Sequence, residues 1–219
     1  MIPPANYAAK EDQYFSAARR PFVDELPSNP AARLLEVGCG AGETSAYALA
    51  TQKCGWCCGI ELCPGPAALA RKKMNEVLVG NVETMPLDLP LEHFDILFMS
   101  EVLEHLVDPW ATLKRLRPFL KPGALVRAGS PNVCHYSVVA ALLKGQWRYE
   151  EKGIFDATHL RWFSPAGYRE MFENCGFIID SIRPARALNP KARFFNFVTG
   201  GRWEYLLHSQ TVLKAHLPG

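Results

Sequence analysis

The chain has 219 residues, of which 48% are hydrophobic, so it can bury the core of one α/β domain, and we expect a single domain over residues 1–219. The net charge is only +2, with acids and bases interspersed, and no basic stripe marks nucleic acid as an obligatory partner. No apolar run approaches the ~18 residues of a membrane span, and the N-terminus lacks the basic start and apolar core of a secretion signal, so we expect a cytoplasmic protein with no membrane span.

The first predicted element is a helix over residues 8–26, which ends before Pro27. Apolar and aromatic side chains recur along it at roughly helical spacing: Tyr14, Phe15, Ala18, Phe22 and Val23. Residues 1–30 would then form a helical cover ahead of the first strand.

Residues 33–43 predict a strand, a glycine turn and the start of a helix. The strand is a short apolar run, and three glycines follow it: Gly38, Gly40 and Gly42. Without Cβ atoms the backbone can take positive φ and lie against a ligand, although a glycine turn can also serve tight packing alone. A dinucleotide fold would need a third glycine at position 43, where the chain has Glu43, and Glu36 precedes the turn. These carboxylates favour a ligand with an ammonium and a sulfonium, such as S-adenosylmethionine.

The pattern acid-x-Gly-x-Gly-x-Gly resembles the first motif of class I S-adenosylmethionine-dependent methyltransferases. The resemblance implies a doubly wound, Rossmann-like α/β sheet of seven strands, mostly parallel, with the last strand antiparallel between the fifth and sixth. It implies S-adenosyl-L-methionine as cofactor and S-adenosyl-L-homocysteine as product. It also implies cofactor contacts from the first motif, at Glu36, Gly38, Cys39, Gly40 and Gly42. Tyr14 in the leading helix could face the same site, or could be an ordinary packing aromatic.

A second strand is predicted at residues 56–62. It ends at Glu61, about 20 residues after Gly42, where a strand-helix-strand unit places an acid within reach of a ribose. A carboxylate can accept hydrogen bonds from both ribose hydroxyls, so we expect Glu61 and the adjacent Leu62 to contact the cofactor.

Four of the seven cysteines lie in or beside this strand: Cys54, Cys57, Cys58 and Cys63. A zinc site would need a second ligand pair at a matching spacing, and Cys57 and Cys58 fall inside the buried apolar run. We therefore expect small buried hydrophobic residues with reduced thiols, and no metal.

A helix over residues 64–74 and a third strand at 76–79 follow. Asn81 comes just after that strand, and its amide can both donate and accept, as an adenine edge requires. Asparagine in this position can also form an Asx turn. We expect Asn81 and Val82 to contact the adenine.

The most apolar strand is predicted at residues 94–99. The run Ser-Glu-Val-Leu-Glu-His-Leu follows it and resembles the family's post-strand segment, which implies that Ser100 contacts the methionine part of the cofactor. The same resemblance places Glu101 and His105 near the reacting centre or in support of it by packing. Asp108 and the proline after it then cap a helix that we expect residues 121–123 to close, before a fifth strand at 124–129.

Residues 130–164 are roughly 35 residues between predicted elements, where ~2 to 6 are usual, and we expect them to form a functional lid containing a short helix at 138–143. The segment around residues 156–164 resembles bacterial methyltransferases of sugars and lipid-linked saccharides, and more distantly the ubiquinone-pathway O-methyltransferases. We expect three residues of the lid to bind the acceptor: Asn132, Arg161 and Trp162. Our catalytic hypothesis makes His159 the proton acceptor with Asp156 orienting its ring. Alternatively His159 fastens the lid by hydrogen bonds, and His105 is the rival base.

The C-terminal part predicts a helix over residues 165–175, a strand at 177–183, a helix at 191–200 and a closing strand at 209–216. Basic residues from position 183 onward outnumber the single acid, Glu204. These basic residues either form a solvated surface or attract an anionic substrate.

The predicted function is methyl transfer from S-adenosylmethionine to a small-molecule acceptor, foremost O-methylation of a sugar, a nucleotide sugar or a lipid-linked saccharide. Alternatives are a methyltransferase acting on protein or nucleic acid, and a module that binds the cofactor without catalysis. We expect a monomer or a homodimer. A nicotinamide dehydrogenase is least favoured because position 43 is not glycine.

Overall fold

The computed structural model describes residues 18–219. Tyr14 and most of the predicted leading helix lie outside the described residues, and of that helix the structure shows α3 (Arg20–Asp24). Its residues Phe22 and Val23 are buried against the central sheet, and the ring of Phe22 meets that of Phe98 edge-on.

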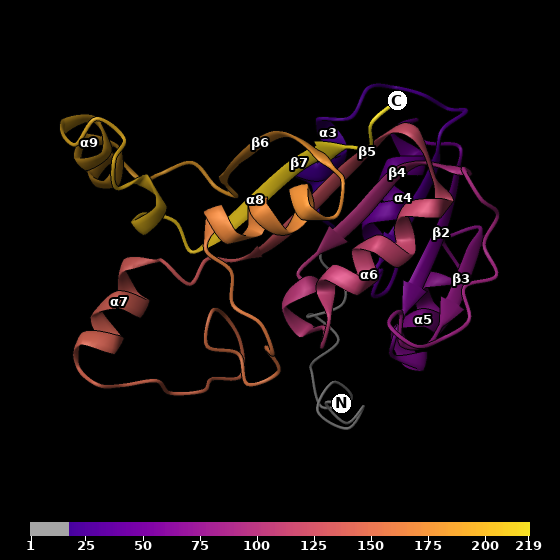
Figure 1. Ribbon diagram of the computed structural model, residues 1–219. Coiled ribbons are helices and arrows are strands. Elements are labelled where there is room, and N and C mark those ends of the chain that lie inside the picture. The colour runs from indigo at the N-terminus through magenta and orange to yellow at the C-terminus, as the bar shows by residue number, and fades with distance from the viewer. Residues whose placement is uncertain (1–17) are drawn as a thin grey trace.

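A seven-stranded sheet forms the centre of the molecule, with the order β3-β2-β1-β4-β5-β7-β6 (Figure 1). Its strands are β1 (Arg33–Val37), β2 (Trp56–Glu61), β3 (Glu76–Val79), β4 (Phe94–Ser100), β5 (Leu120–Pro131), β6 (Ile178–Pro184) and β7 (Gln210–His216). Strands β1 to β5 run parallel, and β7 is antiparallel to both β5 and β6. The predicted doubly wound sheet with an antiparallel last strand is confirmed. The strand order reverses between β1 and β4, which is where ligands bind in sheets of this kind.

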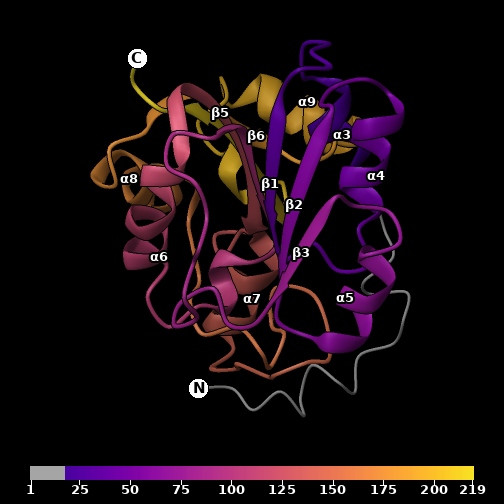
Figure 2. The ribbon, with the colours of Figure 1, turned by 90° about the vertical axis from the view of Figure 1, so that its right-hand side faces the viewer.

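Helices cover both faces of the sheet (Figure 2). On one face, α3 packs with α4 (Glu43–Ala50) and α5 (Pro64–Ala70), and on the other lie α6 (Pro109–Leu116) and α8 (Pro165–Asn174). Successive residues of a strand point to opposite faces, so Leu34 of β1 packs with the first group and Leu35 with the second. Because both faces are buried, the parallel strands are apolar nearly throughout.

Two predicted boundaries were wrong. Residues 121–123 do not close α6, which passes into the 3-10 turn η2 (Arg117–Phe119), and instead they belong to β5. The pairing of β5 with β4 shifts register between Phe94 and Ile96, and this bulge accommodates the proline and glycine at 122 and 123. Helix α5 ends at Ala70 rather than at 74, in a turn that is still hydrogen-bonded to Ala70 O.

The predicted N-caps of α6 and α8 are confirmed. Asp108 Oδ1 accepts from Ala111 N at 2.9 Å, and Ser164 Oγ accepts from Gly167 N at 3.0 Å. Both caps are followed by a proline at the first helical position.

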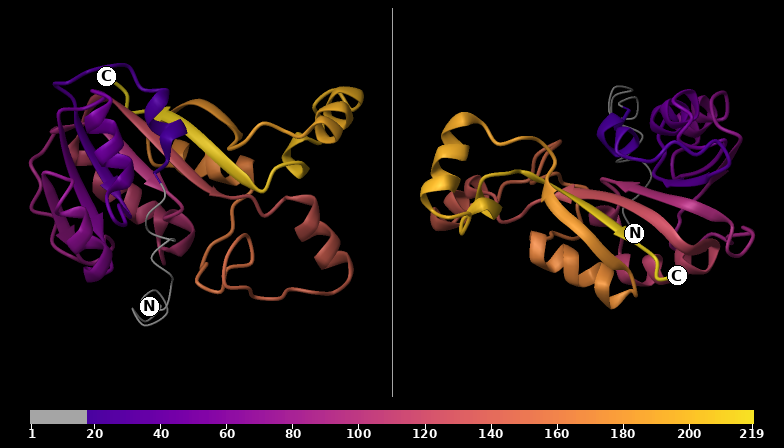
Figure 3. Two further views of the ribbon diagram at one scale, coloured as in Figure 1. Left: turned by 180° about the vertical axis from the view of Figure 1, so that it is seen from behind. Right: turned by 90° about the horizontal axis from the view of Figure 1, so that it is seen from above.

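Two helices project beyond β5 and β7 at one end of the molecule (Figures 1 and 3). They are α7 (Tyr136–Leu143), within the segment predicted as a lid, and α9 (Pro190–Val198), which is followed by the 3-10 turn η3 (Glu204–Leu206). Among residues 18–219, no helix has the length and apolar character needed to cross a membrane.

Candidate functional site

A cavity of about 450 Å³ lies at the carboxyl edge of β1, β2, β3 and β4. The residues from 153 to 160 form its remaining wall. Most of the predicted site residues line it: Glu36, Gly38, Cys39, Gly40, Glu61, Leu62, Asn81, Val82, Ser100, His105, Asp156 and His159. The sheet edge therefore brings together residues that are far apart in the sequence.

The glycine turn has the conformation that its sequence requires. Gly38 has φ of +70°, and a Cβ there would lie 2.5 Å from Val102 Cγ2. Gly42 has φ of +80° and is the N-cap of α4. Unlike Gly38 and Gly40, it does not line the cavity. The backbone between Gly38 and Gly42 lies open to the cavity at Gly40, beside the start of α4.

Glu61 holds this turn in place. Its Oε2 accepts from Gly40 N at 2.8 Å, and its Oε1 accepts from Cys63 N at 2.9 Å. Burial raises the pKa of Glu61, and the backbone N–H donors oppose this rise. The carboxylate thus joins the loops that follow β1 and β2 at the cavity. Its contact with the ribose of the cofactor remains a prediction.

Glu36 lies beneath the turn at the end of β1. Ser45 Oγ donates to its Oε2 at 2.6 Å, and burial raises the pKa of Glu36 to about 7 in spite of that donor. A cationic ligand in the cavity would favour the ionised carboxylate, in keeping with a cofactor that carries an ammonium and a sulfonium.

Asn81 forms the Asx turn that the sequence left open as an alternative, and it also lies at the cavity. It lines the cavity, and its Oδ1 accepts from Glu83 N at 2.8 Å in a local Asx turn. Val82 beside it lines the cavity too, with its side chain in the core. The adenine contact remains a prediction.

The segment after β4 turns sharply at Glu101. This residue has φ of +56°, a left-handed conformation that is uncommon outside glycine and costs roughly 1–3 kcal/mol. Two hydrogen bonds hold it: Glu101 N donates to Gly129 O at 2.9 Å, and Gln210 Nε2 donates to Glu101 Oε1 at 2.7 Å. The turn leads into η1 (Leu103–His105), in which His105 lines the cavity and the buried Glu104 does not.

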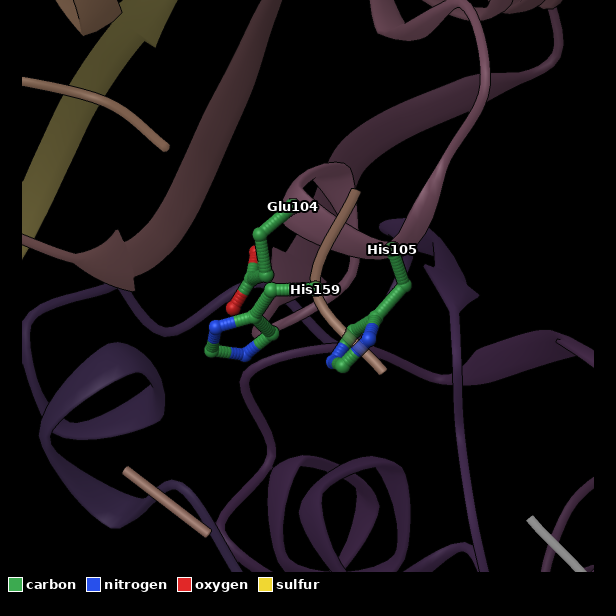
Figure 4. A group of neighbouring side chains, drawn as sticks. All are labelled: Glu104, His105 and His159. Carbon is green, nitrogen blue, oxygen red and sulfur yellow. The ribbon is translucent and has the colours of Figure 1, made fainter. Parts of the chain in front are cut away.

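The side chains of Glu104, His105 and His159 converge where the two histidines line the cavity, although His159 comes from the predicted lid (Figure 4). Each offers a ligand atom within 4.8 Å of the other two, and the two imidazole rings lie 4.8 Å apart. The backbone ties the segments together, because Leu160 N and Arg161 N both donate to Glu104 O. One carboxyl group and two imidazoles can exchange protons with a substrate, and they are also a donor set that can hold a divalent cation.

Contacts to carbonyl oxygens favour one tautomer of each of the two histidines. His159 Nδ1 lies 3.2 Å from Ile154 O, and His105 Nδ1 lies 3.2 Å from Thr158 O. A carbonyl can only accept, so each neutral ring carries its proton on Nδ1 and its lone pair on Nε2. The Asp156 carboxylate accepts from Thr158 N and Thr158 Oγ1, at 2.9 and 2.7 Å, and so braces the turn that carries His159.

Glu104 was not among the site residues predicted from the sequence. Its side chain is 1% exposed, and neither carboxyl oxygen has a hydrogen-bond partner within the described residues. Burial and the nearby charge of Glu101 raise the pKa of Glu104 well above its ordinary value, which favours the neutral acid. Its position directly before His105 was the only sequence signal.

Three residues predicted to bind the acceptor do not line the cavity. Asn132 is fully buried, and its Nδ2 donates to Tyr205 O and His208 O at 2.7 and 2.8 Å. Arg161 donates to the carbonyls of Leu160 and Val107, and Trp162 Nε1 donates to Ile154 O at 3.2 Å. Asn132 and Arg161 thus tie residues 132–163 to other segments of the chain, and Trp162 makes a contact within these residues.

Comparisons with known proteins agree with this geometry. Residues 7–182 match the protein family described as "Methyltransferase domain". The chain is similar to proteins named "Ubiquinone biosynthesis O-methyltransferase": it is 28% identical to that of Saccharophagus degradans, over 84% of this chain and 83% of the relative, and 30% identical to that of Hahella chejuensis, over 90% and 83%.

Solved structures share the fold. A SAM dependent methyltransferase from Archaeoglobus fulgidus aligns with a TM-score of 0.65 at 18% identity, covering 94% of each chain, and one from Aquifex aeolicus with a TM-score of 0.63 at 15% identity, covering 99% of this chain and 100% of the other. The family match spans most of the sequence and includes the glycine turn, Glu61 and the post-strand segment. The chain therefore belongs to the class I S-adenosylmethionine-dependent methyltransferases.

Proposed function

We propose that this enzyme transfers a methyl group from S-adenosylmethionine to a hydroxyl group on an aromatic ring. The observation that carries the proposal is the apolar residue that follows each histidine in the lining of the cavity, Leu106 after His105 and Leu160 after His159. A flat ring with one or two hydroxyls can satisfy such walls, whereas a sugar would bring many hydroxyls that need polar partners. The names of the relatives favour an aromatic acceptor too, and they do not support the sugar acceptor that we expected from the sequence.

The reaction needs alignment and the removal of one proton. The acceptor oxygen forms a bond to the methyl carbon as the bond from sulfur to that carbon breaks, and S-adenosylhomocysteine leaves. In this proposal the hydroxyl proton passes to His159 Nε2, whose lone pair follows from the contact between Nδ1 and Ile154 O. His105 lies beside this ring and stays the rival base.

The direct test offers the enzyme catechols, simple phenols, nucleotide sugars, saccharides, protein and nucleic acid in separate reactions with methyl-labelled S-adenosylmethionine, and follows the products by mass spectrometry. The proposal expects label on an oxygen of the phenols or catechols only. Label on sugars alone would refute the aromatic acceptor. Label on added protein or nucleic acid alone, or no transfer to any acceptor despite cofactor binding, would favour the alternatives from the sequence.

A further inference from the structure

Helix α9 packs none of its side chains into the core. Its large apolar residues all lie on the surface, with Phe194 71% exposed and Phe197 84% exposed, and Phe195 and Val198 are also exposed. Isolated exposed apolar residues are common on proteins, but four within five positions form a patch of the kind that marks an interaction site.

The apolar residues of α9 share a helical face with a basic side chain. Phe194, Phe197 and Val198 are three and four residues apart and so lie on one side of the helix. Lys191 is three residues before Phe194 and lies on the same side of the helix. Arg193 directly precedes Phe194 in the sequence. Aromatic rings together with basic residues are typical of helices that lie in the interface of a membrane without crossing it.

Helix α7 extends this exposed surface. Leu143 is 85% exposed, and Tyr136 and Leu142 are exposed as well. Both helices project from the same end of the molecule in every view (Figures 1 and 3). Their bases are joined by Asn132, which precedes α7 and binds the carbonyls of Tyr205 and His208 that follow α9. We call residues 136–149 and 185–207 together the projecting surface.

The projecting surface is strongly basic. It carries six exposed Lys or Arg residues against one acid, Glu204: Lys144, Arg148, Arg186, Lys191, Arg193 and Arg202. The surface thus has a formal charge of +5, while the whole chain has +2, so the remaining residues sum to −3. Positive charge therefore gathers at one end of a molecule that is otherwise acidic.

We propose that the projecting surface binds an anionic lipid bilayer, with Phe194 and Phe197 inserted at the level of the headgroups and the basic side chains on lipid phosphates. The charge argues for this occupant, because lipid phosphates neutralise six basic residues. A second copy of this chain would bring another +5 to the same contact and be repelled. No helix among residues 18–219 could span the bilayer, so the binding is peripheral. This proposal is independent of the methyl acceptor.

The test measures how the purified full chain sediments with vesicles of phosphatidylcholine alone and of phosphatidylcholine with about one third phosphatidylglycerol. The proposal expects binding to the anionic vesicles only, weakened as salt rises. Phe194→Ser with Phe197→Ser should lower the partition coefficient at least tenfold, because two apolar rings that would be removed from water are lost. Lys191→Glu with Arg193→Glu should lower it at least 25-fold, at about fivefold for each basic residue lost.

Matched controls lie outside the projecting surface, two of them directly after α5 at the opposite end of the molecule (Figure 1). Arg71→Glu with Lys72→Glu makes the same change of charge on exposed residues, and Leu91→Ser removes an exposed apolar side chain, 69% exposed, from the loop between β3 and β4. Both controls should bind anionic vesicles nearly as wild type does. All variants should keep the shift in melting temperature caused by S-adenosylhomocysteine, because α9 buries no residue.

Three results would overturn the proposal. The wild-type chain could fail to bind the anionic vesicles, or the variants on the projecting surface could bind no less tightly than the controls. Light scattering could instead show a dimer that the two phenylalanine replacements dissociate while vesicle binding is unchanged, and the surface would then be an interface between two copies.

Discussion

Replacing Glu61 with alanine should both destabilise the protein and weaken its hold on the cofactor. The Glu61 carboxylate accepts from Gly40 N and Cys63 N, and both donors sit in a buried corner of the cavity wall. Two unsatisfied buried N–H groups cost about 1–3 kcal/mol each. Relief of the carboxylate's own desolvation, which raises its pKa, offsets part of this loss, so we expect a net destabilisation of roughly 2–4 kcal/mol. For a chain of this size that corresponds to a fall in melting temperature of about 4–16 °C.

Glu61→Ala should also lower the affinity for S-adenosylhomocysteine by about 5- to 150-fold, because the ribose loses charge-assisted hydrogen bonds worth about 1–3 kcal/mol. Thermal unfolding of the free protein measures the first effect, and titration calorimetry below the melting range measures the second. Glu61→Gln is the control, since its amide oxygen can still accept from one of the two N–H groups and should recover part of the stability. If Glu61→Ala unfolds at the wild-type temperature and binds with wild-type affinity, the carboxylate neither organises the glycine turn nor meets the ribose.

Three further outcomes follow from the site. Because burial raises the pKa of Glu36 from 4.5 to about 7, the folded state holds this proton more tightly than the unfolded state, and on the order of 3 kcal/mol of stability present below pH 4.5 is lost as pH rises to 7. Urea unfolding should show that Glu36→Gln flattens this dependence, and an equally steep profile in the variant would exclude Glu36 as its source. His159→Ala should lower the maximal rate by ~10²- to 10⁴-fold with cofactor affinity intact, while His216→Ala, at the remote end of β7, should not; a loss of acceptor affinity alone would make His159 a positioning residue. If His159 is the base, dialysis against a chelator should leave the rate unchanged, whereas loss of activity that a divalent cation restores would make Glu104, His105 and His159 its ligands.

The glycine turn, the position of Glu61 and the parallel part of the sheet could be predicted because their signals are local, whereas the antiparallel last strand followed only from the family resemblance. Apolar runs mark the strands, glycines mark the turn, and the distance from the glycines to Glu61 is the length of one strand-helix-strand unit. The predicted ends of an element were wrong where a contact with another element determines them. Strand β5 begins earlier than predicted because a bulge adjusts its pairing with β4.

The residues that meet at the acceptor end of the cavity could not be predicted from local sequence signals. Glu104 and His159 meet only because η1 turns back after β4 and its carbonyl oxygen accepts from Leu160 N and Arg161 N, contacts that span more than 50 residues of sequence. The apolar residues of α9 likewise have an ordinary amphipathic spacing, and periodicity cannot tell whether the face they form is buried or exposed. His159 lines the cavity and its Nδ1 contacts Ile154 O, and its role as the base stays a prediction. Arg161 does not line the cavity and donates to the carbonyls of Leu160 and Val107.

Thermal unfolding with S-adenosylhomocysteine and, separately, with NAD tests the central claim most directly. The cavity sets Glu36 and Glu61 beside a glycine turn that is followed by Glu43 instead of glycine, a site suited to the sulfur-containing cofactor and not to a pyrophosphate. At a ligand concentration 100 times the dissociation constant, S-adenosylhomocysteine should stabilise the protein by about 2.7 kcal/mol and raise the melting temperature by about 5–11 °C, with no shift from NAD. A shift with NAD alone, or equal shifts with both ligands, would contradict the account.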